Sequence, residues 1–419
     1  MNTTETLVIG AGHAGLAVSH CLSARNLDHV VVDAGRIGER WRSERWDSLH
    51  LLTPNWMNRL PGWDYDGPEP EGYLSAAGFA EHLSRYAASF GPPVLENTRV
   101  QRVRSSDDAF EVSTSNGRWT VRNVIVASGA ADRPNVPAMA ARMTEGIRQV
   151  PATDYRNPST LPDGGVLVVG GSASGVQIAD ELRRAGRRVL LAVGRHTRLP
   201  RRYRGMDVLW WLSALGLLDK PAGVTAQDEP SLQLIGRPGG TAAQYEVDLV
   251  SLQRRGVWLT GRLADVDGTT VSFADDLTTT AASADSRMDR LLGRIDRYIR
   301  VNGLEREVEP ATRPERLPAV DRPVLRTDLA ALGITSVVWA TGFRRCYPWL
   351  QVPALDEAGE LRQVRGVTAV PGLYTVGQRW QTRRNSSSID GARHDAGSVV
   401  RHLAVRRALR VPRDDDLAA

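Results

Sequence analysis

Residues 6–15 read Thr-Leu-Val-Ile-Gly-Ala-Gly-His-Ala-Gly, an apolar run that leads directly into three spaced glycines. The apolar run predicts a short buried strand. Residues 13–25 follow with the spacing of a helix, which places Leu16 and Ala17 on one face. A second apolar run, residues 29–33, ends in an acid. The start of the chain therefore predicts a strand–helix–strand unit.

The glycines of this unit fit the spacing G-x-G-x-x-G, and their setting between a strand and a helix is the one that binds a dinucleotide. Gly10 permits a tight turn, Gly12 lets the backbone approach a pyrophosphate, and Gly15 lets helix and strand pack closely. The helix N-terminus offers free N–H groups to the phosphates. The alternative is a glycine-rich turn with a structural acid. The candidate contacts are Gly10, Gly12, His13, Ala14, Gly15 and Asp33.

The pattern recurs in the second quarter of the chain. An apolar run at 166–169 leads into Gly170-Gly171-Ser172-Ala173-Ser174-Gly175, a helix is expected over 174–185, and a strand over 188–193. The next strand does not end in an acid but is followed by arginines. Arginine removes repulsion toward a 2′-phosphate and adds a forked donor, although it also occurs simply on solvated surface loops. The candidate contacts are Gly170, Ser172, Ala173, Ser174, Gly175, Arg195 and Arg198.

Two sites of this kind imply two nucleotides. Asp33 suits an adenosine with free ribose hydroxyls, hence FAD, whereas the basic second site suits NADPH. The fold expected is α/β, with two Rossmann-like dinucleotide-binding domains, the second inserted into the first. Residues 1–145 form the first part of the FAD-binding domain. Residues 160–330 form the NADPH-binding domain with helical insertions, and residues 331–410 form the C-terminal part of the FAD-binding domain.

Several further elements follow from the apolar spacing. A helix is expected at 76–90, an antiparallel meander within 100–127, and a third strand of the second site within 331–342. Segments 200–225 and 284–303 read as helices, either covering a core or walling a substrate pocket.

Composition limits the class of protein. The chain has 419 residues, of which 42% are apolar and 24% charged, as in globular proteins. No apolar run approaches the length of a membrane span, and the fold begins too early for a signal peptide, so we expect a soluble, cytoplasmic protein. Residues 411–419 are expected to be a frayed tail.

Charge and cysteine content exclude other classes. The net charge is +5, and Lys220 is the single lysine, so arginine carries the positive charge. The arginines are dispersed and no recognition motif accompanies them, which argues against nucleic acid as a partner. The two cysteines, Cys21 and Cys346, form no C-x-x-C pair. The histidines are scattered without zinc-ligand spacing, so no metal site is expected.

With these motifs the chain resembles the class B flavin-dependent monooxygenases, in a bacterial branch of the flavin-containing monooxygenase-like group. The likeness covers nearly the whole chain. Val126-Ala127-Ser128-Gly129 looks like the first crossover between the two domains of that family, and Trp339-Ala340-Thr341-Gly342-Phe343 looks like the second. Leu373-Tyr374-Thr375-Val376-Gly377 is similar to the late strand whose glycine lies against the flavin.

The resemblance implies further contacts to the flavin nucleotide. Gly38-Glu39-Arg40-Trp41 resembles the stretch in which arginine and tryptophan flank the cofactor, and Val100 stands where the family has a backbone contact to adenine. The cofactor-binding residues that it implies are Arg40, Trp41, Val100, Ala127 and Gly377.

Two departures from the family pattern stand out. The linker hallmark has a histidine four residues before an aromatic residue, but here Pro151 precedes Tyr155, which puts Baeyer–Villiger chemistry in doubt. The family often has a Thr-Asn pair near the flavin, where the asparagine steadies a peroxyflavin. The nearest match is Thr53-Pro54-Asn55, which makes Asn55 the candidate catalytic residue, with a turn residue after Pro54 as the alternative.

The activity that the resemblance implies is an FAD- and NADPH-dependent monooxygenation. A C4a-(hydro)peroxyflavin would oxygenate a small organic substrate at nitrogen, sulfur or carbon, including a carbonyl, while bound NADP⁺ shields it from water. The partners are then the substrate and O₂, and a homodimer stays open. The Trp-rich stretch 41–63 is a candidate pocket wall, with flavin packing and core as the alternative.

Three other functions stay open at this point. A pyridine-nucleotide disulfide reductase shares the two-site architecture but needs a cysteine pair. An NADPH:flavin dehydrogenase would pass electrons to a quinone or a protein. A non-catalytic FAD-binding sensor would bind the flavin without consuming NADPH.

Overall fold

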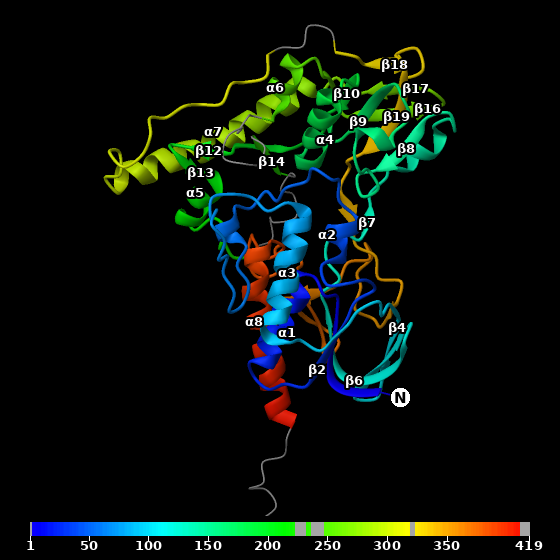
Figure 1. The fold of residues 1–419 in the computed structure, drawn as a ribbon, viewed down its shortest axis with the longest axis vertical. Helices are drawn as coiled ribbons and strands as arrows, with labels where there is room; N and C mark the ends of the chain where they lie inside the picture. Colours follow the sequence, from blue (N-terminus) through cyan, green and yellow to red (C-terminus); the bar gives the residue numbers. More distant parts are fainter. Residues whose placement is uncertain (1, 223–231, 236–246, 319–322, 411–419) are drawn as a thin grey trace, which may run out of the picture.

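The computed structural model describes residues 2–222, 232–235, 247–318 and 323–410. The end of the segment expected at 200–225 and the tail expected at 411–419 lie outside these residues. Figure 1 shows two bodies: a lower one built from both ends of the chain, and an upper one built from its middle. This arrangement confirms the expected α/β fold with a second nucleotide-binding unit inserted into the first.

The lower body contains a sheet whose central strands are parallel and buried. Strand β1 pairs with β2 on one side and with β6 on the other, and β24 returns from the end of the chain to pair with β6. The expected meander is confirmed, because β4, β5 and the first half of β6 are antiparallel. The strands are β1 (Asn2–Ile9), β2 (His29–Val32), β3 (Val94–Leu95), β4 (Val100–Ser106), β5 (Ala109–Thr114), β6 (Gly117–Val126), β21 (Leu350–Gln351), β22 (Gln363–Val364), β23 (Val367–Thr368) and β24 (Leu373–Thr375).

Three helices cover this sheet. Helix α1 (His13–Ser23) packs against α8 (Ile389–Arg410), and α3 (Ala76–Phe90) begins where predicted, with Ser75 capping its first turn. Leu16, Phe79 and Val399 meet in one core cluster from these three helices. The N- and C-terminal parts of the chain therefore share a single core.

The upper body contains a five-stranded sheet in which every pairing is parallel. Its strands β9 and β10 are buried along their whole length, as expected for continuous apolar runs covered on both faces. The elements are β8 (Arg148–Pro151), β9 (Gly165–Val169), α4 (Ala173–Arg184), β10 (Val189–Ala192), α6 (Leu249–Arg254), β15 (Trp258–Thr260) and β19 (Ile334–Trp339). An antiparallel sheet of β16 (Leu263–Asp267), β17 (Thr270–Phe273) and β18 (Arg326–Asp328) lies beside it.

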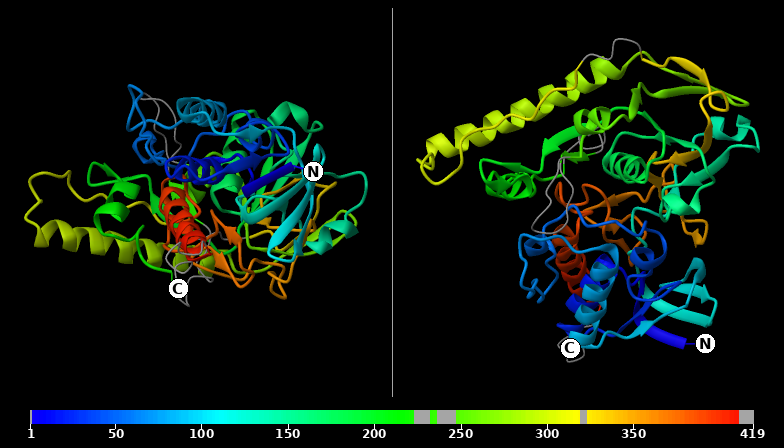
Figure 2. Two further views of the ribbon diagram at one scale, coloured as in Figure 1. Left: turned by 90° about the horizontal axis from the view of Figure 1, so that it is seen from below. Right: turned by 45° about the horizontal axis from the view of Figure 1, so that its top comes forward.

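The two expected insertion helices are present as α5 (Val208–Ala214) and α7 (Leu277–Val301). Helix α7 projects well beyond the upper sheet (Figure 2). Its apolar positions Met288, Leu292 and Ile295 pack on Trp211 of α5, which supports the core-covering interpretation of segment 284–303. The remaining elements are α2 (Glu39–Ser43), three short 3₁₀ helices (Asn55–Met57, Ala138–Arg142 and Pro158–Thr160), β11 (Thr197–Pro200), β12 (Arg202–Tyr203), β13 (Met206–Asp207) and β14 (Leu232–Ile235).

The boundaries between the bodies differ from those expected. Strands β8 and β19 both belong to the upper sheet, so the chain has entered that body by residue 148 and leaves it after residue 339, not at 160 and 331. The crossing itself is a small antiparallel pair of β7 (Arg133–Pro134) and β20 (Phe343–Arg344). Membership of β8 and β19 in the upper sheet is set by strand pairing, which the spacing of apolar residues in the sequence does not reveal.

Candidate nucleotide-binding clefts

The first glycine loop has the geometry that a dinucleotide needs. Gly10 has a φ of +110°, and a β-carbon there would lie 2.5 Å from the carbonyl oxygen of Ala127. A β-carbon on Gly15 would overlap the carbonyl oxygen of Gly10, whereas one on Gly12 would meet nothing within 4 Å. Gly10 and Gly15 are therefore required by the protein itself. The open space beside Gly12 is where a ligand backbone can approach.

The groups around this loop are set to receive an anion and a sugar. No side chain caps α1, and its first turn holds no acid, whereas Ser75 and Asp248 cap α3 and α6. The N–H groups at the start of α1 therefore stay available to a pyrophosphate. Asp33 accepts hydrogen bonds from the amides of Ala11 (2.6 Å) and Gly35 (2.8 Å), which hold its carboxylate at the cleft.

His13 begins helix α1 and lines the same cleft. Burial lowers its pKa to about 4, so the imidazole is neutral at pH 7. Its Nε2 atom is buried and has no hydrogen-bond partner in the protein. A buried nitrogen without a partner suits a site that a bound group completes.

The other residues expected at the first nucleotide also line this cleft, whose volume is about 340 Å³: Ala14, Arg40, Trp41, Val100, Ala127 and Gly377. Arg40 donates to the carbonyl of Ala131 (2.7 Å) and to Asp132 (2.8 Å) and so forms part of the rim. Trp41 packs edge-on against Phe79. The structure therefore places predicted residues from the N-terminal and the C-terminal parts of the chain in one cleft.

Among the residues of this cleft that the sequence analysis missed are Arg45 and Ser387. Arg45 lies over the Trp41 ring, 5.1 Å from its centroid, and burial lowers the pKa of its guanidinium. Ser387 approaches from the loop before α8. Arg45 follows Trp41 by four residues, a helical spacing that could have predicted their contact. No sequence pattern predicts Ser387 here, because it reaches the cleft only through the tertiary packing of α8.

The second glycine loop repeats the first. Gly170 has a φ of +119°, and a β-carbon on Gly175 would overlap the Gly170 carbonyl oxygen. Helix α4 also lacks a side-chain cap and an acid in its first turn. The cleft measures about 590 Å³, within the range of ligand sites. Among its lining residues are the predicted Gly170, Ser172, Ala173, Ser174 and Arg195.

The prediction for Arg198 is wrong in its geometry. Its side chain is 4% exposed and donates to Asp285 (2.6 Å) and Asp248 (2.6 Å). The arginine is turned into the body because two buried carboxylates require a cation. Arg262, which follows β15 at the carboxyl edge of the sheet, lines the cleft beside Arg195 instead. The parallel pairing of β15 with β10 places Arg262 there, and the sequence analysis did not identify that strand.

The geometry also contradicts the catalytic prediction for Asn55. The side chain is 2% exposed, its Nδ2 donates to the carbonyl of Glu69 (2.9 Å), and its Oδ1 accepts from the amide of Leu74 (2.9 Å). It does not line either cleft. Asn55 braces the loop around it, which is the turn interpretation.

Tyr155 and the tryptophans are mostly structural. Tyr155 is fully buried and donates to Glu181 (2.7 Å), and burial raises the pKa of its hydroxyl. Trp46 joins the core of the upper body, and Trp63 packs against the core of the lower one. Trp41 is the tryptophan of the stretch that lines a nucleotide cleft.

The two clefts meet where the chain crosses between the bodies. Residues 128–132 line the first cleft, while Pro134, Asn135 and residues 340–343 line the second. Thr341 donates to the carbonyl of Asn135 (2.7 Å) and joins both crossing segments. The segments of the crossing therefore border both clefts.

Within the described residues, no helix is long and apolar enough to span a bilayer. Among these same residues, no group of three histidine, cysteine or acidic side chains is placed to hold a metal ion.

Comparison with known proteins gives consistent matches. A family model described as pyridine nucleotide-disulphide oxidoreductase matches residues 7–215. A CzcO-like oxidoreductase of Geobacillus kaustophilus is 32% identical over 409 residues, which cover 95% of this chain and 98% of that protein. A probable indole-3-pyruvate monooxygenase of Arabidopsis thaliana, YUCCA1, is 32% identical over 42% of this chain and 44% of its own. The flavin-containing monooxygenase from Stenotrophomonas maltophilia matches in structure with a TM-score of 0.67 over 97% of this chain and 99% of its own, at 20% identity.

The fold is the one seen in the flavin-containing monooxygenase from Stenotrophomonas maltophilia, as the resemblance implied. The chain belongs to the family of the CzcO-like oxidoreductases.

Proposed function

We propose that the chain is an FAD- and NADPH-dependent monooxygenase that acts on a small organic substrate. The observation that carries this proposal is the pair of clefts that meet at one crossing, the first with an acid for a ribose and the second with arginines for a phosphate. The name of the Stenotrophomonas neighbour, a flavin-containing monooxygenase, is in keeping with it.

The residues of the first cleft fit FAD. The amides of His13 and Ala14 would hold the pyrophosphate, and Asp33 would bind the ribose of the adenosine. Arg45, partly buried on Trp41, would place a positive charge in this cleft, which favours an anionic ligand. When bound, FAD supplies hydride acceptance and reaction with O₂, which side chains do not provide.

The residues of the second cleft fit NADPH. Arg195 and Arg262 would pair with the 2′-phosphate, and the free amides of α4 would bind the pyrophosphate. The crossing residues between the clefts would exclude water from the meeting point of the two rings. No side-chain acid–base set is required for this role.

Disulfide reduction does not suit this chain. Cys21 is buried in the core of the lower body, Cys346 lies apart from it, and neither lines a described cleft. Transfer of electrons from NADPH to a quinone or a protein would use the same clefts and differs from monooxygenation in the fate of oxygen.

The test begins with the visible spectrum of the purified protein. Flavin absorbance that bleaches on anaerobic NADPH addition would support the cofactor pair. Mixing the reduced protein with O₂ should then give a transient absorbing species before the flavin reoxidises. A screen of amines, thioethers, ketones and indoles should yield an oxygenated product. A colourless protein that takes up no FAD would overturn the proposal. Reoxidation by a quinone without oxygenated product would favour the dehydrogenase.

A further inference from the structure

A short segment of the upper body is hydrogen-bonded to the loop that leads into α8 of the lower body. We call residues 218–222 the strap and residues 382–386 the dock. Pro221 and Arg383 form an antiparallel bridge, and Arg383 pairs with Asp219 at 2.7 Å. Three backbone bonds join the rest: Ala222 N–H to Thr382 O (3.1 Å), Arg384 N–H to Lys220 O (2.9 Å) and Asn385 N–H to Leu218 O (3.1 Å).

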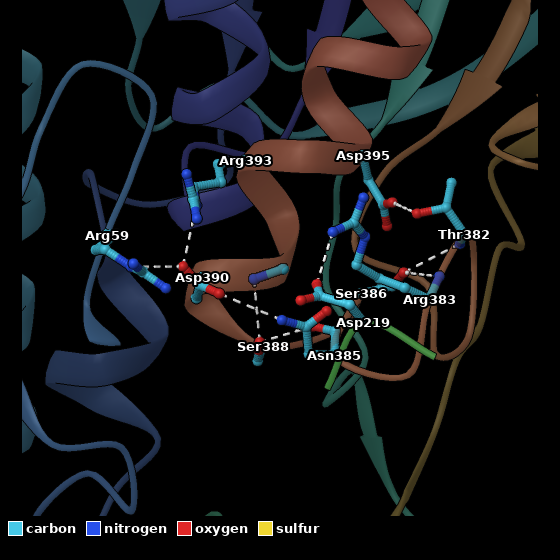
Figure 3. Close-up of polar contacts among 11 residues, drawn as sticks. Arg59, Asp219, Thr382, Arg383, Asn385, Ser386, Ser388, Asp390, Arg393 and Asp395 are labelled. Carbon is cyan, nitrogen blue, oxygen red and sulfur yellow. Dashed lines mark hydrogen bonds and ion pairs between the residues drawn. The ribbon is translucent and has the colours of Figure 1, made fainter. Parts of the chain in front are cut away.

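A buried carboxylate lies beneath the dock. Asp395, in the second turn of α8, is 0% exposed and accepts a hydrogen bond from the Thr382 hydroxyl (Figure 3). Ser386 lies near this carboxylate. The Ser386 hydroxyl oxygen also accepts from the amides of Thr382 (3.0 Å) and Arg383 (3.1 Å). Thr382, at the start of the dock, is therefore bonded directly to Asp395, and Ser386, at its end, is bonded back to Thr382 and Arg383.

The dock also borders the first nucleotide cleft. Ser387, the next residue, lines that cleft. The backbone here leaves no slack, because a β-carbon on Gly391 would overlap the carbonyl oxygen of Asn385. Figure 3 shows the dock held on the other side by Asp390, which contacts Asn385, Arg59 and Arg393. A change in the position of the dock would therefore move both the strap and the cleft wall.

We propose that Asp395 is a positioning residue that couples the first cleft to the strap. Because Asp395 fixes the dock, binding of FAD in the cleft stabilises the contact between the strap and the dock. The coupling is reciprocal: a nucleotide that orders Ser387 also orders residues 218–222 of the other body. The inference rests on the proposed binding of FAD in the first cleft.

The chain contains a natural probe of the strap. Lys220 is the single lysine of the sequence and is exposed in the strap. A protease that cleaves on the amino side of lysine can cut this chain only between Asp219 and Lys220. Because cleavage needs the local segment to open, its rate reports how firmly the strap is seated.

The experiment compares cleavage of the FAD-loaded and FAD-free protein at low protease concentration. In the wild type, FAD in excess over its Kd should slow cleavage at least about tenfold, because a ligand that binds only when the dock is in place stabilises that state by mass action. In Asp395→Asn this protection should fall to about twofold or less. Thr382→Val, which removes the hydroxyl without changing the shape, should behave like Asp395→Asn, whereas Thr382→Ser should retain the protection.

The control is Thr368→Val, which removes a buried hydroxyl bonded to the Leu373 carbonyl in the same body. It should leave the protection of Lys220 unchanged. If Asp395→Asn does not fold, the Thr382→Val and Thr382→Ser pair decides the question. Equal cleavage of FAD-loaded and FAD-free wild type overturns the coupling, and full protection in the Thr382→Val variant overturns the role of Asp395. A wild type that takes up no FAD instead refutes the proposed function.

Discussion

Val193 occupies in the upper sheet the position that Asp33 occupies in the lower one, directly after the strand residue whose carbonyl accepts the amide of the first loop glycine. Asp33 presents a carboxylate to its cleft, whereas Val193 is fully buried against the second loop. The charges that line the corresponding corner come from Arg195 and Arg262. The same fold therefore gives the corresponding corners of the two clefts opposite charges.

Replacement of Arg195 by alanine should weaken NADPH much more than NADH. Loss of a charge-assisted bond to a phosphate corresponds to a factor of about 10–100 in Kd for NADPH. The Kd for NADH should change by less than about twofold. Arg262→Ala should show the same selectivity, and both are measured by titration of the flavin spectrum or of nucleotide fluorescence. Arg254→Ala, an exposed arginine paired with Glu315 on the same body, is the control. Equal losses for both nucleotides would remove Arg195 from the site.

Alanine substitutions at two glycines of the first loop should affect cofactor binding and folding separately. Gly12→Ala places a β-carbon in open space, so the free energy of unfolding should change by less than about 0.5 kcal/mol. The variant should nevertheless be purified with little or no FAD, because the methyl group occupies the approach to the pyrophosphate. Gly15→Ala should destabilise the fold itself, by about 3 kcal/mol or more, since the added carbon overlaps the Gly10 carbonyl oxygen. Thermal unfolding and flavin content of both variants provide the measurement. A Gly12→Ala protein with full flavin content would show that the nucleotide does not use this loop.

Arg198 should matter for stability and not for nucleotide choice. Substitution by methionine leaves Asp248 and Asp285 as unpaired buried carboxylates, which costs about 3–5 kcal/mol in the free energy of unfolding. The preference for NADPH over NADH should stay as in the wild type. Urea denaturation and the two nucleotide Kd values test this. A variant of unchanged stability with lost NADPH preference would restore Arg198 to the phosphate site.

The sequence predicted those parts of the molecule that local rules determine. The two glycine loops, Asp33 and helix α3 follow from spacing, turn chemistry and apolar periodicity, and the structure has them in place. The errors concern long-range contacts. Arginine and asparagine often bind cofactors, but the polar atoms of Arg198 and Asn55 are bonded to other elements of the protein, Asp285 and the loop at Glu69. Whether a polar side chain faces a cleft or a buried partner depends on tertiary packing.

The stability of the nucleotide-free protein should fall in mild acid partly because of His13. Burial lowers its pKa to about 4, whereas in the unfolded chain a histidine titrates near its usual value of about 6.5. Between these values the unfolded state binds the proton and the folded state does not, so the free energy of unfolding decreases as the pH falls from 7 toward 4. For this partly exposed side chain we expect a contribution of about 1–3 kcal/mol. His13→Gln should lack this part of the decrease in urea denaturation at pH 7 and pH 5, while His402→Gln, at an exposed position of α8, should retain it. An identical acid dependence in wild type and His13→Gln would contradict a neutral imidazole at the start of α1.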